Sequence, residues 1–122
     1  MLKTKIAVFV SGGGTNFEAL INAQENGKIP HGEIVLMVSS SKTAYALKRA
    51  ENHGIKSVVC SKKELGSQES FEEEILKNLE ENDIQLIVLA GFMSILSKEF
   101  TKKYENRIIN IHPSLIPSFC GE

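Results

Sequence analysis

Asn110 and His112 stand two positions apart in the segment Asn-Ile-His-Pro. The apolar run Ile108–Ile111 predicts a strand that ends here, and side chains at positions i and i+2 of a strand point to the same face. A carboxamide and an imidazole side by side suit a reaction in which a carbonyl oxygen becomes negative, because Asn110 can donate a hydrogen bond and His112 can donate one or move a proton. The alternative is that both side chains only satisfy backbone groups at a strand end.

A glycine-rich segment, SGGGTN at residues 11–16, lies between a predicted strand and a predicted helix. Glycine lets the backbone approach an anion closely, and the start of a helix offers unpaired amides. A dinucleotide fingerprint would need glycine at Phe17, and the ATP-binding pattern is absent, so the loop predicts a site for a smaller phosphate such as a sugar monophosphate. A simple tight turn is the alternative. Thr15 and Glu18 have the spacing of a capping box, which predicts a side-chain cap on this helix.

The elements that position these residues alternate regularly between strand-like and helix-like segments. The strands are apolar at nearly every position, which is typical of a parallel sheet covered on both faces. We therefore expect an α/β fold: a doubly wound, Rossmann-like, mostly parallel sheet with helices on both faces. The predicted strands cover residues 5–10, 33–38, 55–59, 84–90 and 108–111, and the predicted helices run from Thr15 to a stop at Gly27 and over residues 43–53, 67–82 and 97–104.

Charged side chains away from the predicted edge are expected on the surface. The acidic residues between Glu69 and Asp83 surround an apolar stripe, as on the solvated face of an amphipathic helix. His31 and His53 fall in a turn and at a helix end, where we expect solvated side chains. No carboxylate or cysteine joins these histidines at metal-ligand spacing, so no metal site is predicted.

Composition limits the class of protein. The 122 residues are 42% hydrophobic and 24% charged, with a net charge of −1, which excludes a general electrostatic attraction to nucleic acid or to an anionic membrane. The apolar run at residues 86–93 is far shorter than the roughly 20 residues that span a bilayer. Cys60 and Cys120 indicate no disulfide framework. We expect a cytoplasmic protein with a single α/β domain over residues 1–122, incomplete at its C-terminal end because no helix follows the fifth strand.

Three motifs together resemble a known family. They are SGGGTN after the first strand, LAGFMSIL after the fourth and NIHPSLIP after the fifth. In this order they resemble the folate-dependent formyltransferases, and the SGGGTN loop is similar to that of the glycinamide ribonucleotide formyltransferase branch. The resemblance covers the whole chain. It implies transfer of a formyl group from 10-formyltetrahydrofolate to the amine of glycinamide ribonucleotide in de novo purine biosynthesis, by a monomer or homodimer without a metal.

The resemblance also assigns roles to single residues. It implies that Asn110 and His112 are catalytic. The implied contacts to the substrate phosphate come from Gly14, Thr15 and Asn16, and those to the folate from Gln68, Met93, Ser94, Ile95, Leu96 and Asn110. Gln68 and Ser94 stand where the family often has arginine, so positive charge is missing near the folate. The family's catalytic aspartate lies beyond residue 122, so we expect this chain to have little or no turnover.

Two other functions remain open at the level of the sequence. One is a related folate-dependent formyltransferase or deformylase, with aminoacyl-tRNA or water as acceptor. The near-neutral charge argues against tRNA, because tRNA-binding proteins usually carry a basic stripe. The other is a non-catalytic α/β module that binds a phosphorylated metabolite. Replacing His112 with alanine separates the two classes, since only an enzyme would lose transfer and keep phosphate binding.

Overall fold

The computed structural model of the chain describes residues 3–42 and 45–111, and within them five parallel strands form one sheet in the order β3-β2-β1-β4-β5. This confirms the predicted parallel sheet. The strands are β1 (Thr4–Val10), β2 (Gly32–Ser39), β3 (Lys56–Val59), β4 (Leu86–Ala90) and β5 (Ile108–Ile111). The helices are α1 (Thr15–Glu25), α2 (Ala46–Asn52), α3 (Lys62–Leu65), α4 (Gln68–Glu81) and α5 (Lys98–Lys103), of which the one-turn α3 was not predicted.

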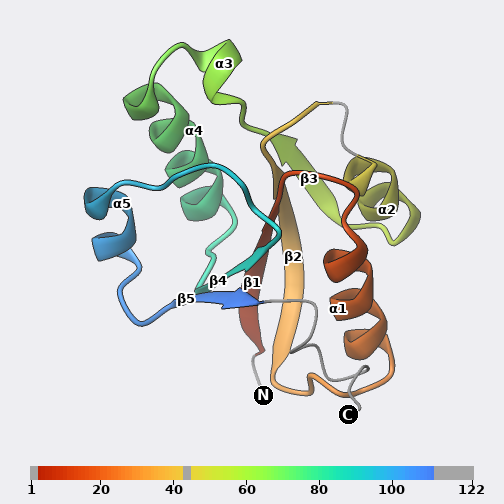
Figure 1. The fold of residues 1–122 in the computed structure, drawn as a ribbon. Coiled ribbons are helices and arrows are strands. Elements are labelled where there is room, and N and C mark those ends of the chain that lie inside the picture. Colours follow the sequence, from red (N-terminus) through yellow and green to blue (C-terminus); the bar gives the residue numbers. More distant parts are fainter. Residues whose placement is uncertain (1–2, 43–44, 112–122) are drawn as a thin grey trace.

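Helices cover both faces of the sheet, as the fold prediction required. Figure 1 shows α1 and α2 on one side and α4 and α5 on the other. Alternate residues of β1 enter the two layers: Val8 and Val10 belong to the cluster that includes α1, whereas Ala7 and Phe9 belong to the cluster that includes α4. Such double burial explains why the strands read as continuous apolar runs. None of the described helices has the length and apolar character that a membrane span requires.

The strand order reverses between β1 and β4. The chain winds from β1 outward to β3, then crosses back and adds β4 on the free side of β1. The pairing of β1 with β4 runs in register up to Phe9 and Leu89. The loops that follow β1 and β4 therefore leave the same edge side by side, which is the position where open α/β sheets bind ligands.

The predicted capping box at the start of α1 is wrong. Gly14 is the N-cap, with φ 80° and ψ 28°, and no side chain caps the helix. Thr15 is instead the first helical residue, because the left-handed turn at Gly14 starts the helix one position earlier than the pattern predicts. By contrast, Ser67 and Ser97 cap α4 and α5 by accepting hydrogen bonds from Ser70 N and Phe100 N. The first N–H groups of an α-helix have no acceptor within the helix. In α1 no capping side chain accepts their hydrogen bonds either.

Candidate active site

The Ser11 hydroxyl joins three loops at the carboxyl edge of the sheet. Met93 N–H, in the loop after β4, donates to Ser11 Oγ over 2.7 Å. Ser40 Oγ, directly after β2, donates to the same oxygen over 2.7 Å. The glycine loop and the loop at residues 91–97 are therefore fixed to each other, so a ligand bound to one lies next to the other.

The glycine loop is open on one side and closed on the other. Gly12 and Gly13 are exposed, and a Cβ added at either would meet no atom within 4 Å. A Cβ on Gly14 would lie 2.6 Å from Ala46 Cβ and 3.0 Å from Ala46 Cα. Only glycine lets α1 begin this close to α2. The open side leaves an anion free to approach the first turn of α1, where Thr15 is exposed and Asn16 half-buried.

Arg49 of α2 supports the glycine loop from behind. Its Nε donates to the Gly13 carbonyl oxygen over 2.8 Å. Its Nη1 lies 3.4 Å from Glu18 Oε1, and its guanidinium carbon is 4.9 Å from the centre of the Tyr45 ring. The guanidinium thus binds a carbonyl of the loop and adds positive charge beside it. Nothing local in the sequence indicates this contact, because Arg49 and Gly13 are 36 positions apart.

His53 corrects a second prediction, since its side chain is only 18% exposed and is paired rather than solvated. Its Nε2 lies 2.8 Å from Glu18 Oε2 and its Nδ1 lies 3.1 Å from Glu25 Oε2. The hydrogen bond to Glu18, together with that to Glu25, raises the pKa of His53 against the effect of burial. The same contact with His53, helped by Arg49, lowers the pKa of Glu18. These pairs fasten α1 to α2 behind the glycine loop.

The loop after β4 presents an apolar surface beside the glycine loop. Met93 is 83% exposed and Ile95 is 81% exposed. Leu96 and Phe92 pack against the core instead, while Ser94 is half-buried. Leaving a large apolar side chain in water forgoes about 1.5–3 kcal/mol of burial free energy. Two such side chains form an exposed apolar surface at this edge of the sheet. The contact with folate that the resemblance implies for residues 93–96 stays a prediction.

Gln68 reaches this loop but does not have its amide free for a ligand. Its Nε2 donates to the Ile95 carbonyl oxygen over 2.8 Å and to Glu72 Oε2 over 2.6 Å. Both amide hydrogens are thereby used within the protein, so only Oε1 remains to accept a bond from a ligand. The structure places Gln68 against the predicted folate loop and gives it a role in holding that loop.

Glu72 corrects the prediction that the acidic face of α4 is solvated. The residue is 8% exposed. Ser97 N–H donates to Glu72 Oε2 and Ser97 Oγ donates to Glu72 Oε1, each over 2.6 Å. Burial raises the pKa of Glu72, but the hydrogen bonds from Ser97 and Gln68 outweigh it and keep the pKa below its ordinary value. A charged carboxylate therefore holds the end of the 91–97 loop.

Asn110 lies at the same edge. It pairs with Leu89 in the parallel ladder between β4 and β5, one position before the end of β5, and its side chain is exposed. The β5 strand thus carries Asn110 to the edge where the two loops emerge. His112 lies outside the described residues, so its place beside Asn110 stays a prediction.

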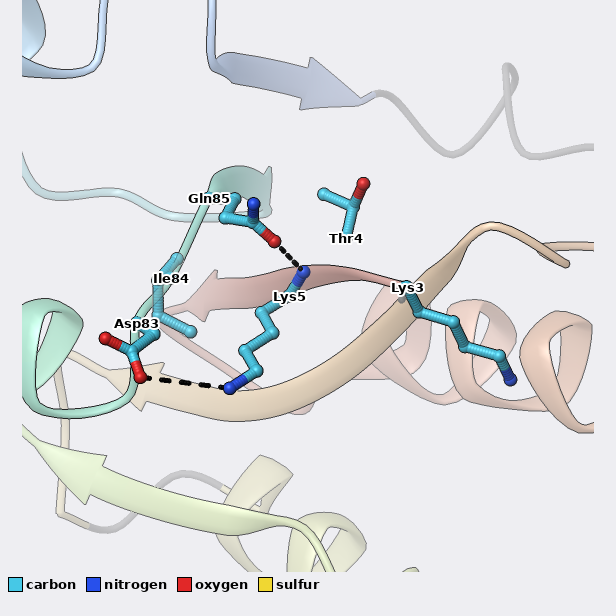
Figure 2. A pocket seen from close by; sticks show the side chains of 6 residues that line it. All are labelled: Lys3, Thr4, Lys5, Asp83, Ile84 and Gln85. Carbon is cyan, nitrogen blue, oxygen red and sulfur yellow. Dashed lines mark hydrogen bonds and ion pairs between the residues drawn. The ribbon is translucent and has the colours of Figure 1, made fainter. Parts of the chain in front are cut away.

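The pocket at residues 3–5 and 83–85 and the buried thiol of Cys60 lie outside the candidate site. A pocket before the amino ends of β1 and β4 (Figure 2) is lined by Lys3, Thr4, Lys5, Asp83, Ile84 and Gln85. Lys5 is already paired there, since its N–H donates to Gln85 Oε1 over 2.9 Å and its Nζ lies 3.8 Å from Asp83 Oδ2. Burial raises the pKa of the Cys60 thiol to about 12, so this cysteine is no nucleophile. In the described ranges, no three His, Cys, Asp or Glu side chains gather as metal ligands.

Comparison with known proteins identifies the family. The sequence profile of the formyl transferase family matches residues 4–122. The chain is 49% identical over 119 residues to the trifunctional purine biosynthetic protein adenosine-3 of Gallus gallus, covering 98% of this chain and 12% of that protein. It is 39% identical over 117 residues to the phosphoribosylglycinamide formyltransferase of Haemophilus influenzae, covering 96% of this chain and 55% of that protein.

A solved structure shares the fold. The glycinamide ribonucleotide transformylase 1 of Geobacillus kaustophilus matches with a TM-score of 0.86 and 38% identity, over 98% of this chain and 63% of that one. The doubly wound fold predicted from the sequence is therefore confirmed, as is the resemblance to the formyltransferases. The chain spans between about an eighth and two thirds of the length of these relatives.

Proposed function

This chain belongs to the formyl transferase family, and from that premise we propose that it transfers a formyl group from 10-formyltetrahydrofolate to the amine of glycinamide ribonucleotide. The reaction is a step of de novo purine biosynthesis. The names of the Haemophilus and Geobacillus proteins support this acceptor over water or aminoacyl-tRNA. A cytoplasmic monomer or homodimer that uses no metal fits the proposal.

In this proposal the ribonucleotide phosphate binds at Gly14, Thr15 and Asn16. Three observations support the assignment. The first turn of α1 has no side-chain cap, so its N–H groups are available to an anion. Gly12 and Gly13 leave the approach open. Arg49 holds the Gly13 carbonyl oxygen from behind, which keeps the loop in this open shape.

The folate would lie on the loop after β4, against Met93 and Ile95, with Ser94, Leu96, Gln68 and Asn110 around it. The two exposed apolar side chains support this placement, because a ring system that covers them removes apolar area from water. The hydrogen bond between Met93 N–H and Ser11 Oγ keeps this surface beside the phosphate loop.

Asn110 and His112 would assist the transfer itself. When bound, 10-formyltetrahydrofolate supplies the formyl group, which ends on the amine nitrogen of the ribonucleotide. The Asn110 carboxamide would donate a hydrogen bond to the formyl oxygen, which gains negative charge as the amine attacks. The attacking amine must lose a proton, and the folate nitrogen that releases the formyl group must gain one. His112 would carry this proton from the amine to that nitrogen. Loss of one such donor typically costs about 10²–10³ in rate.

The observation that carries the proposal is the hydrogen bond from Met93 N–H to Ser11 Oγ, because it joins the loop before an uncapped helix start to a loop with exposed apolar side chains. The test is a calorimetric titration of the folded chain with glycinamide ribonucleotide and, separately, with glycinamide. Saturable binding of the ribonucleotide alone is expected. A folded sample that binds neither compound contradicts the phosphate assignment.

A transfer assay on the complete protein carrying His112→Ala or Asn110→Ala tests the chemistry, because residues 1–122 alone are expected to have little or no turnover. Each variant should lose about 10²-fold or more in rate while ribonucleotide binding stays unchanged. His31→Ala is the matched control, since His31 is an exposed histidine next to β2 at the amino end of the sheet. If His112→Ala transfers as fast as His31→Ala, the catalytic role of His112 is refuted.

A further inference from the structure

We propose that Glu72 is a positioning residue: its carboxylate holds the 91–97 loop in the shape that binds the folate, although it does not touch the folate itself. The inference rests on the proposed function and adds a residue that the motifs do not include. Its basis is the set of hydrogen bonds among Glu72, Ser97 and Gln68.

The burial of Glu72 needs an explanation. A glutamate is almost never this buried unless it is paired, because removing its charge from water is costly. Within the described residues the recorded partners of this carboxylate are Ser97, through N–H and Oγ, and the Gln68 amide, and none is a cation. Hydrogen bonds to an ionised acceptor are roughly twice as strong as neutral ones. The negative charge therefore acts on the loop through three short donor contacts.

The loop is fixed at both of its ends by such contacts. Ser11 Oγ holds Met93 N–H at one end, and Glu72 holds Ser97 at the other. Between them, Gln68 Nε2 holds the Ile95 carbonyl oxygen. Glu72 governs two of these anchors, because it also accepts a bond from the Gln68 amide that reaches Ile95.

These anchors explain why two apolar side chains stay in water. Met93 and Ile95 are 83% and 81% exposed. Burial of such side chains is favourable, so an unanchored loop would turn them toward the protein. With its backbone held at Met93, Ile95 and Ser97, the loop keeps them exposed before any ligand arrives. Preorganisation of this kind raises affinity by reducing the cost of ordering on binding.

The test compares Glu72→Ala, Glu72→Gln and the control Glu73→Ala, which removes the same charge from an exposed neighbour on the same helix. Affinities for 10-formyltetrahydrofolate and for glycinamide ribonucleotide are measured by calorimetry, and exchange of the Ser97 amide hydrogen by NMR. Glu72→Ala should weaken folate binding by about 10- to 100-fold and speed Ser97 exchange by about tenfold or more. Ribonucleotide affinity should change by less than about twofold, because the glycine loop is untouched.

Glu72→Gln should give a smaller loss, about three- to tenfold, since one carboxamide oxygen still accepts from Ser97 N–H and Gln68 but without the charge. This nearly isosteric variant decides the matter if Glu72→Ala does not fold. Folate affinity equal to that of Glu73→Ala overturns the positioning role and leaves the proposed function standing. An unmodified chain that binds the ribonucleotide but no folate overturns both the folate part of the proposed function and this inference.

Discussion

Replacing Gly14 with alanine is expected to destabilise the fold and to distort the glycine loop. Gly14 has φ +80°, a conformation that side chains rarely adopt, and it begins α1. The new Cβ would lie 2.6 Å from Ala46 Cβ and 3.0 Å from Ala46 Cα. A gap below 3.0 Å between two Cβ atoms cannot be kept, so α1 and α2 must move apart.

The size of the effect follows from these two costs. The left-handed conformation costs an alanine about 1–2 kcal/mol. An extra methyl group in a closely packed contact costs about 1–3 kcal/mol. Alanine also lowers the conformational entropy of the unfolded chain, which stabilises the fold by about 0.4–1 kcal/mol. We expect a net loss of about 1–5 kcal/mol, centred near 3, against the about 5–15 kcal/mol that stabilises an ordinary domain.

Urea unfolding followed by circular dichroism measures the loss. Gly12→Ala is the control, because a Cβ there meets no atom within 4 Å and Gly12 has no positive φ. It should change the free energy of unfolding by less than about 1 kcal/mol. The double variant Gly14→Ala, Ala46→Gly should recover about 1 kcal/mol, since it removes the closest contact but not the strained φ. If Gly14→Ala is as stable as Gly12→Ala, the reasoning from the Ala46 contact is refuted.

Three further predictions concern the charges and the thiol. The pKa of His53 is raised in the fold, so its stabilising effect is complete below about pH 6.5 and is lost as the pH rises through that raised pKa. Urea unfolding at several pH values should show the unmodified chain losing stability relative to His53→Gln over that range. Parallel stability curves for the two proteins would contradict this. Arg49→Ala should weaken ribonucleotide binding by about tenfold, because it leaves the Gly13 carbonyl oxygen of the glycine loop without this partner. Lys48→Ala removes the same charge from an exposed position and should leave the affinity unchanged. Equal losses of affinity in the two variants, measured by calorimetry, would rule out a specific role of Arg49. In a Cys120→Ser background, a thiol reagent should modify Cys60 only as fast as the protein unfolds, because Cys60 is buried with a pKa of about 12; immediate labelling would show that it is accessible.

The fold could be predicted because its signals are local. The central strand β1 is buried on both faces, so its apolar residues follow one another without interruption, as Val8, Phe9 and Val10 do. The starts of α4 and α5 could also be located, since Ser67 and Ser97 cap the amide three residues later. The resemblance of three motifs to the formyltransferases then identified the glycine loop and the residue 93–96 loop, which the structure brings together through Ser11 and Met93.

The predictions that failed depended on contacts between distant parts of the chain. The capping box of α1 is a sound local pattern, but the packing of Gly14 against Ala46 decides where the helix begins. His53 and Glu72 were expected in solvent because both are polar residues on helices. Each is instead matched by a partner far along the sequence: Glu18 lies 35 positions from His53, and Ser97 lies 25 positions from Glu72. A single sequence carries no signal for such pairs.

Strand order explains why the proposed phosphate site lies beside the exposed apolar surface of the loop after β4. Ser11 and Met93 are 82 positions apart, yet they follow strands that are neighbours in the sheet. Parallel strands bring all their carboxyl ends to one edge, and the reversal between β1 and β4 leaves that edge uncovered by a crossover helix. The proposed transfer from a ring-bearing folate to a phosphorylated acceptor needs this adjacency, because the two reacting atoms must come within about 3–3.5 Å. Since the Ser11 hydroxyl joins the two loops, we expect its removal to weaken ligand binding at both proposed sites and not at one alone.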